Sequence, residues 1–146
     1  MFRKIILVTS IASTLTLAGC TSMPNPSTDR NLDKLQNKNW VLTEINQVIY
    51  KADPRQSAVP TMIFNSYEVS GTDGCNQFMG GYAVMGTQIK FANLKSIENN
   101  ACLDVTDLPE KFSQALSQVV SYDASSTELK LLDSNDKVVV KFKSVK

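Results

Sequence analysis

Cys75 lies in a glycine-rich segment whose residue types could support chemistry. Residues 70–82 read Ser-Gly-Thr-Asp-Gly-Cys-Asn-Gln-Phe-Met-Gly-Gly-Tyr and hold four of the six glycines in the chain. Such a segment could be a loop with a thiol nucleophile, a ligand cradle or a tight structural turn. No lysine follows with phosphate-loop spacing and no helix opens here, which favours the turn. Gly71 and Gly74 suit a bulge or turn that needs positive φ, and Asn76 suits hydrogen bonding to nearby backbone groups.

The absence of histidine narrows the chemistry further. It excludes Ser-His-Asp and Cys-His catalysis and every imidazole metal site. A nucleophilic Cys75 would need another activating group, and a neighbouring carboxylate such as Asp73 disfavours a thiolate. Four aspartates could be imagined as a calcium or acid/base cluster, but they lack the loop spacing that fixes coordination. The four aspartates are Asp53, Asp73, Asp104 and Asp107. We expect them to be solvated loop charges, and we expect no catalytic residue, no metal and no cofactor.

The first twenty residues predict export and lipidation. A basic Arg3-Lys4 head precedes an uncharged apolar run, as in a secretory signal peptide over residues 1–19. The run ends in Leu-Ala-Gly-Cys, which resembles the lipobox of bacterial lipoproteins. Cys20 would therefore carry diacylglycerol and an amide-linked acyl chain such as palmitate, and several acyl chains give stable anchoring.

The residues after Cys20 predict where the domain sits. Thr21 replaces the aspartate that usually retains lipoproteins in the inner membrane, which favours the periplasmic face of the outer membrane. Residues 20–37 are polar and proline-containing, and we expect a flexible tether with at most a helical turn near residues 32–35. Loss of Arg3 and Lys4 leaves 13 basic against 14 acidic residues, a net charge of about −1. Nothing in this charge pattern indicates a nucleic-acid partner.

The two remaining cysteines form an even pair. With Cys20 assigned to lipid, Cys75 and Cys102 are left in an oxidising compartment, where a disulfide is the simplest fate. A free catalytic thiol and a metal site are the alternatives.

Short strands and one helix follow the tether. Alternating apolar residues predict strands, and Asn65-Ser66 and Gly86-Thr87 suit two-residue hairpin turns, the second of type II′. Apolar residues at helical spacing predict a helix over about 107–121, capped by Asp107. The expected strands cover residues 40–45, 61–64, 67–70, 80–85, 88–91, 129–131 and 138–142.

These elements predict a mainly β fold, a small antiparallel barrel-like sheet with one covering α-helix. Aromatic residues could fill the barrel or line a ligand cavity, and small barrels more often pack them in the core. They are Trp40, Phe64, Phe78, Tyr82, Phe91 and Phe142.

The folded part resembles the META domain of HslJ-like heat-shock lipoproteins. The resemblance rests on Gly74-Cys75-Asn76, on Ala101-Cys102 before a helix, and on Leu129-x-Leu131 near the end. It covers nearly all of the expected domain, residues 38–146. The stretch 98–101 departs from the family, which usually has Thr and Met there. The resemblance implies a small β-rich domain, envelope location and an association with stress or drug tolerance without a defined enzymatic activity.

Two functions remain open. One is a non-enzymatic, lipid-anchored envelope protein that acts by interaction in stress tolerance, with an unknown envelope protein or small ligand as partner. The other is an inhibitor or small-ligand-binding module, for example against a lysozyme or protease. An inhibitor would present a rigid exposed loop, for which residues 46–60 and the turn around Asp73 are candidates.

Overall fold

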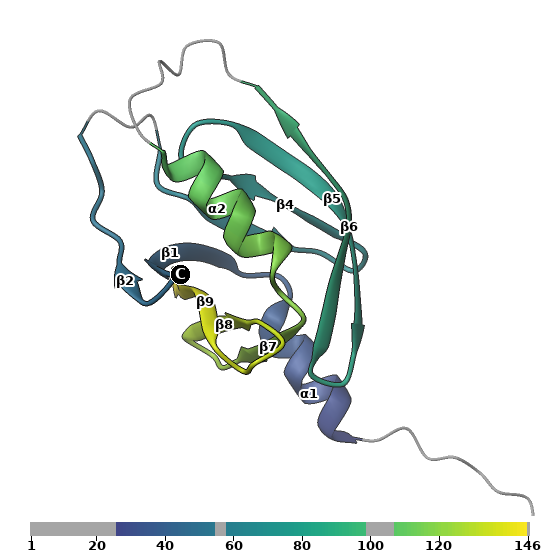
Figure 1. Cartoon of the computed structure of the whole chain (residues 1–146). Helices are drawn as coiled ribbons and strands as arrows, with labels where there is room; N and C mark the ends of the chain where they lie inside the picture. Colours follow the sequence, from purple (N-terminus) through teal and green to yellow (C-terminus); the bar gives the residue numbers. More distant parts are fainter. Residues whose placement is uncertain (1–25, 55–57, 99–106, 146) are drawn as a thin grey trace, which may run out of the picture.

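The computed structural model describes residues 26–54, 58–98 and 107–145 (Figure 1). The predicted signal peptide, Cys20, Cys102 and Asp104 lie outside these residues. The chain order is α1 (Pro26–Leu35), β1 (Asn39–Ile45), β2 (Val48–Ile49), β3 (Thr61–Phe64), β4 (Glu68–Thr72), β5 (Gln77–Met85), β6 (Gln88–Ile97), α2 (Leu108–Ser117), β7 (Ser121–Ala124), β8 (Glu128–Leu132) and β9 (Val138–Val145).

The nine strands form one antiparallel sheet that closes on itself. Its order is β2-β1-β3-β4-β5-β6-β7-β8-β9, and β1 also pairs with β9 from Asn39↔Val145 to Ile45↔Val140. The closure is uneven, because β6 and β7 share a single residue pair, Gln88↔Ser121. The predicted mainly β, barrel-like fold is confirmed, and the ring is weakest between β6 and β7.

The hairpins follow from local turn chemistry. Gly86 has φ +63° whereas Thr87 keeps a negative φ, as the predicted type II′ turn between β5 and β6 requires. The turn between β3 and β4 is shifted from the predicted Asn65-Ser66: the Asn65 N–H donates to Glu68 O at 2.8 Å, so Ser66 and Tyr67 form the turn. Six of the seven expected strands are longer than predicted, β3 has the predicted bounds, and β2 and β7 were not predicted.

The helix α2 is shorter than predicted. It ends at Ser117 rather than near residue 121. The Val120 N–H donates to Leu132 O at 2.9 Å, so pairing with the sheet overrides the helical spacing of the valines. Asp107 occupies the N-cap position, but its side chain makes no capping bond and instead forms an ion pair with Lys111 at 2.7 Å.

A second helix replaces much of the predicted tether. α1 spans ten residues and packs beside β7, where we expected at most one turn. Leu35 at its end is fully buried, and the Trp40 indole Nε1–H donates to Leu35 O at 2.8 Å. The folded part of the chain therefore begins before residue 38, since burial of Leu35 against the barrel stabilises the last turn of α1.

The core lies inside the ring, and α2 completes it. Trp40, Phe64 and Phe142 are fully buried and Phe78 also belongs to the buried core, which confirms core packing for four of the six aromatic residues. Phe112 of α2 lies between two strands, with ring centroids 5.9 Å from Phe78 and 6.3 Å from Phe142. Figure 1 shows α2 lying across the sheet, with the β5–β6 hairpin on one side and β7–β9 on the other. The helix thus fills the side of the ring that β6 and β7 leave open.

β6 contains a bulge beyond its pairing with β7. The register of β5 and β6 shifts between Met79 and Gly81, and Asn93 opposite has φ +52°. Gly80 presses against this bulge: an added Cβ would lie 2.9 Å from Ala92 O, Asn93 O and Leu94 Cα.

We therefore predict losses of stability of different size for two adjacent glycines. Gly80→Ala should lower the free energy of unfolding by about 1–3 kcal/mol, because backbone atoms cannot move aside as a flexible side chain would. Gly81→Ala should cost less than about 1 kcal/mol, since its Cβ would be 3.7 Å or more from any neighbour. Urea unfolding of the two variants measures the difference. Equal losses would show that the bulge does not press on Gly80.

Candidate binding groove

The glycine-rich segment is a structural turn built on Asp73. β4 runs into it and β5 leaves it at Gln77, so the turn itself is residues 73–76. Asp73 Oδ1 accepts the N–H groups of Cys75 at 2.9 Å and Asn76 at 2.7 Å, and Asp73 Oδ2 accepts Asn76 Nδ2–H at 3.1 Å. Asp73 is buried, which corrects the expectation of a solvated charge. Asn76 therefore donates to this carboxylate through both its backbone N–H and its side-chain amide.

The two glycines of this segment have different roles. Gly74 has φ +100°, as the predicted turn requires. Gly71 does not have positive φ, and it is needed for space: an added Cβ would lie 1.9 Å from Thr61 O and 2.9 Å from the Phe78 ring. The prediction of positive φ is therefore right for Gly74 and wrong for Gly71.

The remaining candidate residues do not converge. Cys75 is half-buried in the turn, and its pairing with Cys102 stays a prediction because Cys102 lies outside the described residues. Asp53 is half-buried and Asp107 is exposed beside Lys111. Within residues 26–54, 58–98 and 107–145, no group of three or more metal-ligating side chains comes together.

The loop candidate at 46–60 contains a tight hairpin. Asn46 and Gln47 both have positive φ, and β2 returns to pair with the end of β1 through Ile45↔Val48. Val48 and Ile49 are 69% and 72% exposed. This rigid tip presents two apolar side chains to solvent.

A hollow of the described fold lies where the ring is weakest. A groove of about 1270 Å³ runs between β6 and α2 and reaches β7 and the turn after β8. Its apolar lining comes from both sides, with Phe78, Phe91 and Leu94 from the strands and Phe112 and Leu116 from the helix. Two of the six predicted core aromatics, Phe78 and Phe91, therefore line a cavity as well as the core.

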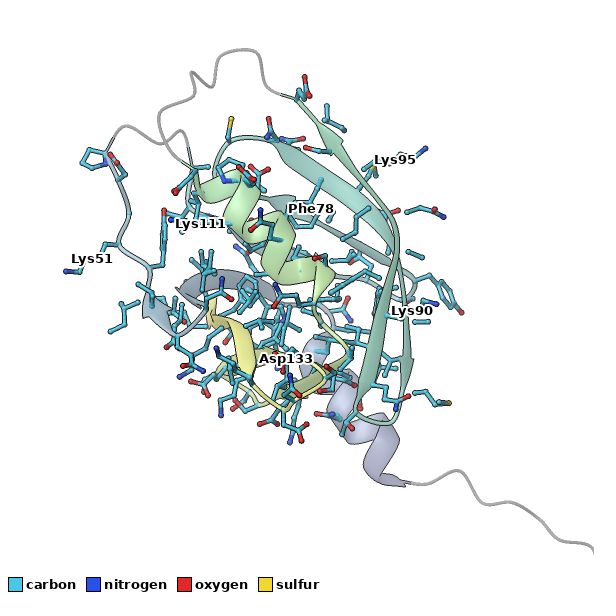
Figure 2. The ribbon with its side chains drawn as sticks, viewed as in Figure 1. Lys51, Phe78, Lys90, Lys95, Lys111 and Asp133 are labelled. Atoms are coloured by element: carbon cyan, nitrogen blue, oxygen red, sulfur yellow. The ribbon has the colours of Figure 1, made fainter. Side chains whose placement is uncertain are left out.

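Small and charged side chains surround this apolar lining. Ser113 and Ser117 of α2 are exposed along one wall. Lys90 and Lys95 belong to β6, whereas Asp133 and Asp136 belong to the turn between β8 and β9 (Figure 2). The groove thus has a basic strand on one flank and acidic residues at the end next to β7.

Tyr122 of β7 also lines the groove. Its side chain is 1% exposed, and its hydroxyl has no hydrogen-bond partner among the described residues. Burial raises the pKa of the Tyr122 phenol, and the nearby Tyr82 adds to the rise. Tyr82 differs, because its hydroxyl donates to Asn65 O and accepts Gln36 Nε2–H at 2.6 Å.

No pattern in the sequence pointed directly to the groove. By their types, the residues that line it fit ordinary core and surface positions. The hollow exists because β6 diverges from β7. The one available clue was the half-buried alternation of Ile89, Lys90 and Phe91, which stops after Phe91. Beyond that point β6 is exposed on both faces.

The fold and the motif define a family. The META domain matches residues 33–146, so the chain belongs to the META domain family. The match includes the end of α1, which agrees with a folded domain that begins before residue 38. No curated protein sequence matches the chain significantly. Within the described residues, none of the helices has the length and apolar character needed to cross a membrane.

Three solved structures share the fold at low identity. A protein from Burkholderia xenovorans, solved by NMR, is 19% identical with a TM-score of 0.62, covering 95% of this chain and 99% of that chain. A second NMR structure is 18% identical with a TM-score of 0.59, covering 76% and 92%. A duf4847 family protein from Bacteroides vulgatus is 13% identical with a TM-score of 0.56, covering 75% and 93%.

Tyr122 gives a prediction at alkaline pH. Because folding raises the Tyr122 pKa above its ordinary value near 10, the unfolded chain loses this proton first, and stability falls as pH rises through and above 10. Tyr122→Phe should reduce this fall, and it should leave stability at pH 7 unchanged or higher because an unpaired buried hydroxyl is removed. Urea unfolding at pH 7 and at pH about 10.5 measures both effects.

The matched control is Tyr67→Phe. Tyr67 is 85% exposed and does not line the groove, so Tyr67→Phe measures the effect of removing a tyrosine hydroxyl from the surface. A slope unaltered by Tyr122→Phe would mean that other groups, such as Tyr50 and Tyr82, carry the whole effect.

Proposed function

We propose that this protein is an HslJ-like, lipid-anchored envelope protein that acts without enzymatic activity in stress tolerance. It binds an envelope protein or a small ligand at the periplasmic face of the outer membrane. The groove between β6 and α2 is the observation that carries the binding part of the proposal. A hollow of about 1270 Å³ with a largely apolar lining is concave enough to bury most of a ligand segment.

The anchoring part rests on the sequence. The basic head, the apolar run and the Leu-Ala-Gly-Cys box support acylation of Cys20, and Thr21 supports the outer membrane. The exported compartment in turn supports a disulfide between Cys75 and Cys102. Such a bond would join the Asp73 turn to the segment before α2 and so help to hold the helix that forms one wall of the groove.

A non-enzymatic role is supported by the chemistry of the groove. The chain has no histidine, and the buried carboxylate of Asp73 is already engaged by three N–H groups of its own turn. The groove is lined by apolar residues, serines and separated charges, a set that suits recognition.

The second candidate function is inhibition of a lysozyme or protease. It rests on the β1–β2 hairpin, whose Val48 and Ile49 are exposed on a rigid tip. Such apolar anchors could enter a partner's pocket. If the protein is such an inhibitor, Val48→Asp should abolish binding to the lysozyme or protease while leaving the groove intact. If the groove is the working site, this change should have no effect on function.

The anchor is tested by Cys20→Ser. We expect the variant to lose incorporation of radiolabelled palmitate and to appear as an uncleaved precursor or a soluble species. Fractionation of the envelope on a sucrose gradient then shows whether the wild-type protein is in the inner or the outer membrane. Equal labelling of variant and wild type would refute acylation at Cys20.

The groove is tested by a matched pair of substitutions on α2. Ser113→Trp places an indole into the groove, whereas Gln114→Trp places it on the adjacent exposed position outside the groove. In cells deleted for the gene, the Gln114→Trp variant should restore growth under heat or detergent stress and the Ser113→Trp variant should not. Immunoblots must show equal export of both. Full restoration by Ser113→Trp would rule out the groove as the working site.

A further inference from the structure

One edge of β6 is left without a partner strand. β6 pairs with β5 along its length, from Gln77↔Ile97 to Met85↔Gln88. On its other side it meets β7 only at Gln88↔Ser121, supported by Ile89 N–H to Val120 O at 3.1 Å. From residue 90 to 97, nothing in the described part of the chain pairs with this outer edge.

The backbone direction shows what the open edge offers. The Ile89 N–H donates toward β7, so the backbone groups of Ile89 face away from β5. Alternation along a strand then places the N–H and C=O of Phe91 on the same edge. Phe91 lines the groove, so this open edge borders it, and the residues of α2 form the opposite wall. A helix satisfies its interior backbone groups within itself and cannot pair with them.

We propose that an extended segment of a partner protein adds to the outer edge of β6 as a further strand. This deepens the proposed groove function by naming the class of ligand. Main-chain hydrogen bonds to β6 would supply affinity, and alternate side chains would enter the groove between Phe78, Leu94 and Phe112. Small serines on α2 leave room for them.

The charges of the groove specify one end of the segment. Ser121 pairs with Leu132, which places Asp133 and Asp136 beside the first residues of β6. Asp123 is near this end too, but it interacts with Lys130 at 3.9 Å. A basic residue at this end of the bound segment would complement the two aspartates of the β8–β9 turn.

Other occupants fit these observations less well. An acyl chain or other apolar small ligand would fill the groove but leave the Phe91 backbone groups unpaired, which is costly away from water. A second copy pairing β6 with β6 would bring Lys90 and Lys95 of both copies onto one sheet, and like charges across strands are destabilising.

The test uses residues 21–146, which retain every described element, and fluorescein-labelled peptides of about eight residues, the length of a typical strand. Threonine and valine alternate in each peptide, with two lysines at either the amino or the carboxyl end. Fluorescence polarisation should show saturable binding for one lysine placement. N-methylation of alternate peptide nitrogens should weaken that binding at least about tenfold, since it removes the ladder donors.

Protein variants locate the binding. Ser113→Trp should weaken it at least about tenfold and Gln114→Trp should not. Asp136→Asn should weaken binding of the lysine peptide by about two- to fivefold. Binding of a peptide with alanines in place of the lysines should be unchanged. Asn suits the positive φ of residue 136, so the backbone is preserved. Hydrogen exchange should show protection of the Phe91 amide on binding.

Two results would overturn strand addition. If N-methylated and unmodified peptides bind equally, the β6 edge is not used. If palmitate binds in a way that Ser113→Trp abolishes while no peptide binds, the groove takes an apolar ligand; strand addition then fails and the proposed groove function stands. If neither peptides nor palmitate bind, strand addition and a small apolar ligand are both refuted. The growth of the two tryptophan variants under stress then shows whether the groove is the working site.

Discussion

The incomplete closure of the sheet is the constraint on which the rest of this structure depends. The ring is sealed firmly where β1 meets β9, through six residue pairs, and only by Gln88↔Ser121 where β6 meets β7. A sheet that opens there exposes its interior to water, and the core would lose apolar burial. α2 supplies the missing wall, and Phe112 occupies the space between Phe78 and Phe142.

Local features on the strand side of the opening accompany this arrangement. The bulge at Asn93 lies close against Gly80, and a bulge disrupts the ladder locally and bends its strand. The Asp73 turn reverses the chain between β4 and β5 and holds its own backbone through one buried carboxylate. Under the proposed binding function, a strand side held by these contacts would need little ordering when a partner binds.

The sequence predicted the parts of this fold that local periodicity controls. Strand alternation, the Gly86 turn and the apolar face of α2 depend on neighbours within a few residues, and each was found as expected. Long-range pairing decides the remainder. Val119 and Val120 fit a helix by spacing but lie beside Leu132, and α1 is stabilised by burial of Leu35 against residues that follow it.

The groove was not predictable in the same way. Its existence depends on which strand edge lacks a partner, and that is a property of closure that no single segment encodes. Phe78 and Phe91 are apolar whether they fill a core or line a hollow. Asp73 was likewise expected in solvent, because its three N–H partners become visible only when the turn is formed.

The attachment of α1 determines how the domain would respond to mechanical tension. Every residue before Pro26 is joined to the ring through this helix and then through β1. The indole of Trp40 holds Leu35 O at 2.8 Å, and the Gln36 amide bonds Asn65 O at 3.1 Å on the turn between β3 and β4. The same Gln36 amide donates to the Tyr82 hydroxyl of β5 at 2.6 Å, so a pull on the amino-terminal side acts on β1, on the β3–β4 turn and on β5 together. Because β5 pairs with β6 along its length, the strand at the groove is one step from this attachment, and tension at the start of the chain would reach it through β5.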